Sequence, residues 1–194
     1  MAKLYFYYAA MNAGKSTTLL QAAFNYAERG MAAMLFTAAV DDRAGAGRIA
    51  SRIGLEAPAT PFDAATDLLA AVRTERERRD IACVLVDEAQ FLTRRQVWQL
   101  AALCDTDDMP VVAYGLRTDF RGDLFEGSAA LLGIADSLIE LKAICGCGRK
   151  ATMNLRVDAS GAAVQDGAQT EIGGNDRYLA LCRRHFVERL ATPI

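Results

Sequence analysis

The stretch Ala9-Ala10-Met11-Asn12-Ala13-Gly14-Lys15-Ser16 decides the fold of this 194-residue chain. It lies between an apolar run and a helical pattern, and it fits the phosphate-binding loop G-x-x-x-x-G-K-[ST] except that Ala9 replaces the first glycine. In such a loop, backbone N–H groups and the start of the helix surround the phosphates, Lys15 reaches the outer phosphates, and the Ser16 hydroxyl ligates Mg²⁺. We therefore expect residues 9–16 to bind a nucleotide.

Short apolar runs alternate with helical patterns around this loop. The alternation is typical of βαβ units, and runs that are apolar throughout indicate strands covered on both faces. Strands are predicted over 3–9, 31–37, 81–87, 110–114 and 137–141. Helices are predicted over 15–29, where Gly30 supplies a C-terminal cap, and after the capping box Thr93-Arg94-Arg95-Gln96. The fold class is therefore α/β, a P-loop domain with a mostly parallel sheet.

An acidic pair, Asp87-Glu88, follows the third predicted strand. Ligands of open α/β sheets bind beyond the carboxyl ends of the strands, so these carboxylates are expected beside Lys15 and Ser16. We predict that Asp87 holds Mg²⁺ through its water shell, and that Glu88 acts as a base or orients a nucleophile. The loop and the acidic pair together favour phosphoryl transfer or hydrolysis of a nucleoside triphosphate.

Composition excludes several classes of protein. The chain is 52% apolar, with 22 basic and 24 acidic residues, which indicates a globular protein rather than a disordered one. The absence of a basic block argues against a dedicated nucleic-acid binder, and no apolar stretch approaches the roughly 20 residues that cross a bilayer. Five cysteines without an export signal favour reduced thiols or a metal site, and a cytoplasmic location.

The end of the chain, residues 142–194, has little apolar content, and such a segment usually needs a disulfide or a bound metal ion to be stable. Cys145-x-Cys147 and Cys182-x-x-His185 supply three sulfurs and one imidazole, a closed tetrahedral set suited to Zn²⁺. Because this set leaves no position for water, we expect the zinc to be structural rather than catalytic.

With these motifs, the chain resembles the cellular-type (type II) thymidine kinases, and particularly their bacterial members. The resemblance covers essentially all 194 residues. Besides the zinc ligands, it rests on Met11-Asn12-Ala13-Gly14-Lys15-Ser16, Val86-Asp87-Glu88-Ala89-Gln90-Phe91, Tyr114-Gly115-Leu116-Arg117-Thr118-Asp119-Phe120 and Ile172-Gly173-Gly174-Asn175-Asp176-Arg177-Tyr178. It implies a RecA-like P-loop domain over 1–141 and a zinc-binding lasso domain over 142–194 that closes over the nucleoside.

The same resemblance implies an activity and its partners. The activity is transfer of the ATP γ-phosphoryl group to the 5′-hydroxyl of thymidine, which gives thymidine monophosphate for pyrimidine salvage and DNA precursor synthesis. The implied cofactors are Mg²⁺ with the ATP and structural Zn²⁺. The implied assembly is a homotetramer with feedback inhibition by thymidine triphosphate.

Individual roles follow by matching positions. Glu88 is implied to be the base that takes the 5′-hydroxyl proton, and ATP and Mg²⁺ are assigned to residues 9–16 with Asp41, Arg43, Asp87 and Gln90. The nucleoside is assigned to Met11, Leu116, Phe120, Gln169, Thr170, Glu171, Ile172, Gly173 and Tyr178. In that set Phe120 packs on the thymine ring, backbone groups of 169–173 bind the base edge, and Tyr178 reaches the sugar.

Two departures from the family pattern concern the metal: His185 stands where other members have a fourth cysteine, and the spacing from Cys145 to Cys147 is one residue shorter than usual.

Two other classes share parts of these patterns. The sequence Asp87-Glu88-Ala89-Gln90 also resembles the acidic box of ATP-driven helicases, although those motors generally close ATP between two RecA-like domains and this chain has room for one. A zinc-ribbon binding module would account for residues 145–185 and leave the phosphate loop unexplained. Phosphoryl transfer that depends on thymidine, rather than on single-stranded DNA or a protein partner, separates the three.

Overall fold

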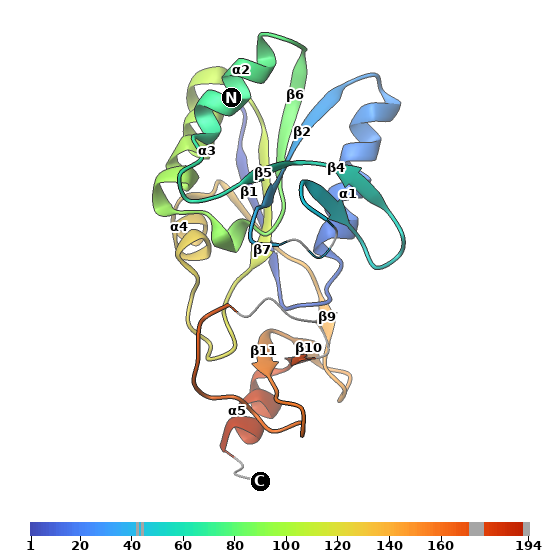
Figure 1. Ribbon diagram of the computed structural model, residues 1–194, viewed down its shortest axis with the longest axis vertical. Coiled ribbons are helices and arrows are strands. Elements are labelled where there is room, and N and C mark those ends of the chain that lie inside the picture. The colour runs from blue at the N-terminus through green and yellow to red at the C-terminus, as the bar shows by residue number, and fades with distance from the viewer. Residues whose placement is uncertain (42, 44, 171–176, 192–194) are drawn as a thin grey trace.

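A six-stranded sheet forms the centre of the computed structural model, which describes residues 1–41, 43, 45–170 and 177–191. Neighbouring strands of this sheet are parallel throughout. In spatial order they are β5 (Thr60–Phe62), β2 (Ala32–Ala38), β6 (Ile81–Val86), β7 (Val111–Leu116), β1 (Leu4–Ala9) and β8 (Ser137–Glu140). This arrangement confirms the predicted α/β class (Figure 1).

Helices cover both faces of the sheet (Figure 1). On one face lies α1 (Lys15–Glu28), and on the other lie α2 (Leu68–Arg76), α3 (Arg94–Asp107) and α4 (Glu126–Ile134). Successive residues of β6 point to opposite faces of the sheet. Val84 joins the buried cluster beneath α2, α3 and α4, and Leu85 joins the cluster beneath α1. Burial on both faces is the reason that these strands are apolar throughout.

The observed boundaries agree with the predicted strands and helices to within two residues. α1 ends at Glu28, and Gly30 follows with a φ of 72°, as a left-handed cap requires. α3 begins after Thr93, whose side chain accepts a hydrogen bond from the Gln96 N–H, and the reciprocal bond completes the predicted capping box. Local sequence signals therefore decide where these elements begin and end.

Several further elements are not predicted by the apolar runs. β5 contains Pro61, which is tolerated because the strand lies at the edge of the sheet. The antiparallel pair β3 (Arg48–Ala50) and β4 (Glu56–Pro58) lies outside the central sheet, and its strands are too short to show a pattern. α4 contains Gly127 and Gly133, which weaken its helical signal.

After β8 the chain forms short elements, drawn beneath the sheet in Figure 1. They are β9 (Ala143–Ile144), β10 (Lys150–Ala151), β11 (Met153–Arg156), β12 (Tyr178–Leu181) and α5 (Arg183–Ala191). β9 pairs with β10 and β11 pairs with β12, both in antiparallel fashion. Across the described residues, the helices lack the combination of length and hydropathy that a bilayer span requires.

The C-terminal segment buries a few of its apolar side chains. It has a small core of its own, since Leu155, Val157 and Phe186 are buried together. A turn at 158–161 is closed by a backbone hydrogen bond, and an antiparallel bridge between Val157 and Ala163 pairs the chain across it, while β11 forms its ladder with β12. The ladder brings the chain back to α5, which carries Phe186 onto β11.

Candidate functional site

The phosphate loop joins β1 to α1 at the carboxyl edge of the sheet. Asn12 and Gly14 both have positive φ, 63° and 78°, and these two turns let α1 begin at Lys15. A Cβ at Gly14 would have nothing within 4 Å, so the backbone conformation, and not crowding, favours glycine there. The loop therefore has the tight turn that the sequence motif predicts.

A cavity of about 490 Å³ lies at this edge, where a ligand of an open α/β sheet is expected. The predicted site residues that line it are Met11, Asn12, Ala13, Gly14, Lys15, Ser16, Asp41, Arg43, Asp87, Glu88, Gln90, Leu116, Phe120, Gln169, Thr170 and Tyr178. Ala9 and Ala10 are buried at the end of β1 and are not part of the lining. Glu171, Ile172 and Gly173 lie outside the described residues.

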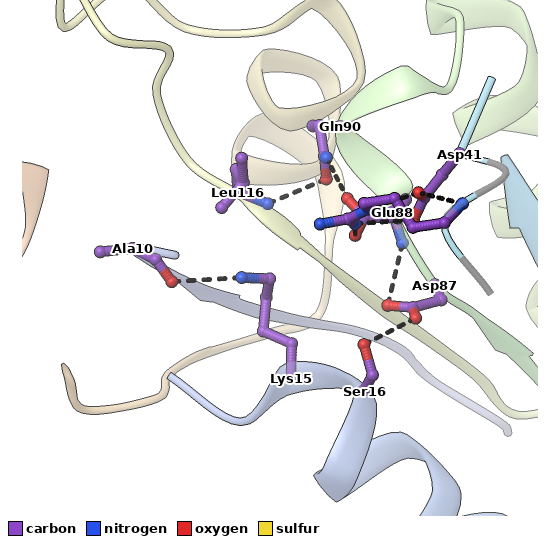
Figure 2. Close-up of polar contacts among 9 residues, drawn as sticks. Ala10, Lys15, Ser16, Asp41, Asp87, Glu88, Gln90 and Leu116 are labelled. Atoms are coloured by element: carbon purple, nitrogen blue, oxygen red, sulfur yellow. Dashed lines mark hydrogen bonds and ion pairs between the residues drawn. The ribbon is translucent and has the colours of Figure 1, made fainter. Parts of the chain in front are cut away.

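Lys15 is buried although its side chain ends in an ammonium group. Its Nζ donates a hydrogen bond to the Ala10 carbonyl over 3.1 Å, inside the loop (Figure 2). Desolvation lowers the pKa of Lys15, and the negative charges of Glu88 and Asp87 oppose that shift. An anion in the cavity would give this ammonium group the partner that its burial requires.

Asp87 is also buried, directly after β6. Its Oδ2 accepts a hydrogen bond from the Ser16 hydroxyl over 2.9 Å, and its Oδ1 accepts one from the Glu88 N–H (Figure 2). Desolvation, and then the charge of Glu88, raise the pKa of Asp87. A hydroxyl and a carboxylate oxygen at this distance are the kind of ligands that Mg²⁺ takes in nucleotide sites, so the residues fit that cation.

Glu88 has a φ of 52°, a left-handed conformation that is uncommon for a residue with a side chain. It immediately precedes the short 3₁₀ helix η1 (Ala89–Phe91). Its Oε1 accepts a hydrogen bond from Arg43 over 2.9 Å. Its Oε2 accepts one from the Gln90 amide (Figure 2). Arg43 is at the same time paired with Asp41 over 2.6 Å. The carboxylate is therefore held from two sides at the cavity wall.

The other end of the cavity is lined by residues from β7 onward. Phe120 is buried, and the guanidinium carbon of Arg156 lies 3.6 Å from the centre of its ring. The buried carboxylate of Asp119 accepts a hydrogen bond from the Gln169 amide over 3.2 Å. The second contact attaches Gln169 to the loop that follows β7.

The four predicted metal ligands come together, with ligand atoms all within 4.8 Å of one another. The sulfurs of Cys147 and Cys182 are 3.9 Å apart, and the Cys145 sulfur is 3.3 Å from Nδ1 of His185. A tetrahedral zinc ion with its usual Zn–S bonds places two sulfurs about 3.8 Å apart. Hydrogen bonds from the backbone N–H groups of Cys147 and Cys182 lower the pKa of Cys145 to about 6, which favours the thiolate form that binds zinc. The set therefore fits a structural zinc ion.

The segment 48–53 also lines the cavity, although the sequence does not predict it there. β3 and the turn after it bring this segment to the cavity, where Arg48 and Arg52 belong to the lining. The available signal was weak: two arginines in a stretch bounded by glycines.

Asn154 is a second cavity residue that was not predicted. Its Oδ1 accepts a hydrogen bond from the Met11 N–H over 2.7 Å, and its Nδ2 donates to the Thr118 carbonyl over 3.1 Å. A buried asparagine inside an otherwise half-apolar strand is the signal that could have indicated it, since asparagine is depleted in strands.

Comparisons with known proteins identify the family of this chain. The family model described as thymidine kinase matches residues 2–186. Proteins named thymidine kinase are 72% identical in Novosphingobium aromaticivorans (98% of this chain, 99% of that one) and 60% identical in Zymomonas mobilis (98% of both). A third, from Vibrio cholerae, is also 60% identical, over 98% of this chain and 99% of its own.

Among solved structures, Bacteroides Pif1 bound to single-stranded DNA has a TM-score of 0.37 at 12% identity, over 72% of this chain and 38% of that one. A likeness of that size supports no statement about fold or function. The family model and the relatives cover nearly the whole chain, phosphate loop and metal ligands included, and this protein therefore belongs to the thymidine kinase family.

Proposed function

We propose that this chain transfers the γ-phosphoryl group of ATP to the 5′-hydroxyl of thymidine, giving thymidine monophosphate and ADP. The observation that carries the proposal is that the phosphate loop and the carboxylate of Glu88 line one cavity, in a member of the thymidine kinase family. Phosphoryl transfer to a hydroxyl needs a positioned acceptor, a base and a cationic clamp, because its catalysis is chiefly positioning and stabilisation of charge.

In this reaction Glu88 takes the proton of the 5′-hydroxyl. The nucleoside oxygen forms a bond to the γ-phosphorus while the bond from that phosphorus to the β,γ-bridging oxygen breaks, and ADP leaves. Lys15 and Arg43 line the phosphate end of the cavity and offset the negative charge of the phosphates, with Asp41 holding Arg43. Main-chain N–H groups of residues 9–16 complete the phosphate cradle.

The nucleoside occupies the other end of the cavity in this proposal. Phe120 packs on the thymine ring, Met11 and Leu116 line the pocket beside it, and Tyr178 reaches the sugar. The base edge is bound by the segment 169–173, of which residues 169 and 170 are cavity residues in the described part of the chain. The position of all these side chains around one cavity supports the assignment.

Ser16 and Asp87 would hold Mg²⁺, which supplies neutralisation of the phosphate charge when it is bound with ATP. Support comes from the hydroxyl and carboxylate oxygens, 2.9 Å apart, and from the burial of Asp87.

Residues 142–194 would form a zinc-binding lasso domain that closes over the nucleoside, while residues 1–141 form the P-loop domain. The zinc ion would be held by Cys145, Cys147, Cys182 and His185, and its role would be to hold together elements that have only small apolar clusters. From the family resemblance we propose further a homotetramer and feedback inhibition by thymidine triphosphate; sedimentation at working concentration and inhibition by that nucleotide test these two points.

A substrate panel tests the main proposal. Purified protein is mixed with Mg²⁺, ATP and one nucleoside at a time, and nucleoside monophosphate and ADP are quantified together. We expect equal amounts of both products with thymidine, and ATP consumption that depends on thymidine. ATP hydrolysis that requires single-stranded DNA would instead favour a motor, and an absence of product with thymidine would overturn the proposed activity.

A further inference from the structure

Gln90 follows Glu88 by two residues and bonds to it directly (Figure 2). We propose that Gln90 is a positioning residue, which fixes the direction of the Glu88 carboxylate, and that it acts on the reaction through Glu88 rather than by binding ATP or Mg²⁺. This inference rests on the proposed function, in which Glu88 is the base. It replaces the nucleotide-binding role that the family resemblance implies for Gln90.

The orientation of the Gln90 amide follows from its partners. The Leu116 N–H donates to Oε1 of Gln90 over 3.0 Å, and a backbone N–H has no other hydrogen-bonding role. Oε1 must therefore face β7, so Nε2 faces Glu88 and donates to its Oε2. A donor at this position fixes Oε2 of Glu88, and the orientation of the carboxylate, and with it the direction of Oε1, is then defined.

The two contacts of the carboxylate are not equivalent. Arg43, which bonds to Oε1, has a side chain that is 42% exposed, and in the proposed reaction it also serves the phosphates. Gln90 is 3% exposed and is anchored at both ends of its amide. When Arg43 turns to the phosphates, Gln90 is the contact that keeps Glu88 in place.

Close packing of the backbone holds Gln90 itself. A Cβ at Gly115 in β7 would lie 3.0 Å from both N and Oε1 of Gln90, tighter than nine in ten such contacts. A Cβ at Gly127 in α4 would lie only 2.5 Å from the Ala89 carbonyl. η1 therefore packs closely against both β7 and α4, which restricts the movement of Gln90.

A direct role in metal binding is a poor fit for Gln90. Mg²⁺ would be bound by the amide oxygen, because that is the ligand atom an amide offers to a hard cation. In this structure that oxygen already accepts the Leu116 N–H at the end of β7. Moving it to a cation would break the bond that anchors the amide.

Two variants of Gln90 test the proposal through steady-state kinetics with thymidine and ATP. In Gln90→Leu both amide contacts are lost, and we expect kcat to fall about 10- to 100-fold while both KM values change by less than about threefold. Gln90→Glu keeps an acceptor for the Leu116 N–H, so that η1 retains its anchor, but it removes the donor and sets a second carboxylate against Glu88. We expect a kcat loss in this variant also, with a normal unfolding transition.

Gln99→Leu is the matched control. Oε1 of Gln99 accepts a hydrogen bond from the Leu68 N–H over 3.1 Å, the same kind of contact as that of Gln90, but between α3 and α2 and away from the cavity lining. We expect unchanged kcat here even if the midpoint of thermal unfolding falls. The control therefore separates a loss of stability from a loss of alignment.

The outcomes are distinct. An unchanged kcat in both Gln90 variants would overturn the positioning role while leaving the proposed function intact. A KM for MgATP that rises tenfold or more at normal kcat would also overturn it, because that pattern identifies a nucleotide ligand. An unmutated protein that does not phosphorylate thymidine would overturn the proposed function and this inference with it.

Discussion

Three charged side chains, Lys15, Asp87 and Glu88, are buried side by side at the edge of the sheet. Burying charge is unfavourable unless it is paired, and here the pairing is partial, as the lowered pKa of Lys15 and the raised pKa of Asp87 indicate. Such a cluster does little for stability. It is explained if a phosphate and a cation join it during the reaction.

At Glu88 the prediction concerns catalysis. Glu88→Gln keeps the shape of the side chain but removes the charge that accepts the proton, so we expect kcat to fall by about 10²- to 10⁴-fold. Binding of ATP and thymidine, measured by calorimetry, should remain close to normal. Glu28→Gln, at the exposed end of α1, is the control and should leave kcat unchanged. Near-normal turnover in Glu88→Gln would remove Glu88 from the mechanism.

At Asp87 the prediction concerns pH. Desolvation and the charge of Glu88 raise the pKa of Asp87 from 3.8 to about 7. Between these two pH values the folded protein therefore holds a proton that the unfolded chain has lost. The free energy of unfolding of the ligand-free protein should therefore fall as the pH rises from 5 to 8, with about 1–3 kcal/mol due to this group.

The variant Asp87→Asn should remove that part of the pH dependence, and urea unfolding at several pH values measures it. Asp105→Asn, which changes an exposed carboxylate, should leave the dependence as it was. A slope that is the same in Asp87→Asn and in the unmutated protein would contradict the assignment.

Among the elements, η1 and α4 show how backbone proximity shapes the site. Gly127 lies in the first turn of α4, and a Cβ there would approach three backbone carbonyls, those of Ala89, Leu92 and Gln90, at 2.5, 2.7 and 3.0 Å. These atoms belong to the backbone of η1 and of the residue that follows it. The clash therefore cannot be relieved by the movement of a flexible side chain. Glycine is therefore required by the packing of two elements and not by its own φ.

We expect Gly127→Ala to lower the free energy of unfolding by about 1–3 kcal/mol, because α4 and η1 must separate to admit the methyl group. The same displacement should reduce kcat, since η1 follows Glu88 directly. Gly133→Ala in the same helix is the matched control: its Cβ would meet nothing within 4 Å, and helix propensity predicts a gain of up to about 1 kcal/mol. Chemical denaturation measures the free energy of unfolding of both variants. Equal changes in the two variants would contradict this account.

On the scale of the whole molecule, the metal ligands and the phosphate loop share one apolar cluster. Ala10 of the loop is buried with Cys145 and Cys182, and Asn154 bonds to the Met11 N–H. The segment that carries the four predicted metal ligands therefore packs against the loop. Loss of a bound metal should therefore change the structure at the cavity as well as at the ligands.

We expect a zinc chelator, and Cys145→Ser, to lower the midpoint of thermal unfolding and to weaken binding of thymidine more than binding of ATP, because in the proposed function the zinc-binding domain closes over the nucleoside. Metal analysis and calorimetry measure the two effects. As control, the chelator should change nothing further in Cys145→Ser. Metal analysis that finds no zinc in the freshly purified, unmutated protein would end the proposal.

Much of this architecture could be predicted from the sequence. The parallel strands, α1 with its Gly30 cap, and α3 with its capping box are encoded by residues close together in the chain. By contrast, β5 could not be predicted. It has only three residues, one of them Pro61, so it shows no local pattern, and its place depends on β2 beside it.

By itself, the sequence determined the fold class, the phosphate loop, the acidic pair and the set of metal ligands, because each is written in spacing over a few residues or in residue types with few alternatives. Only the tertiary structure decided what surrounds them: Asn154 meets the Met11 N–H across 143 positions, and Gln90 meets the Leu116 N–H across 26. Such contacts depend on how β7, η1 and β11 pack. Packing is a property of the whole folded chain, and no local pattern encodes it.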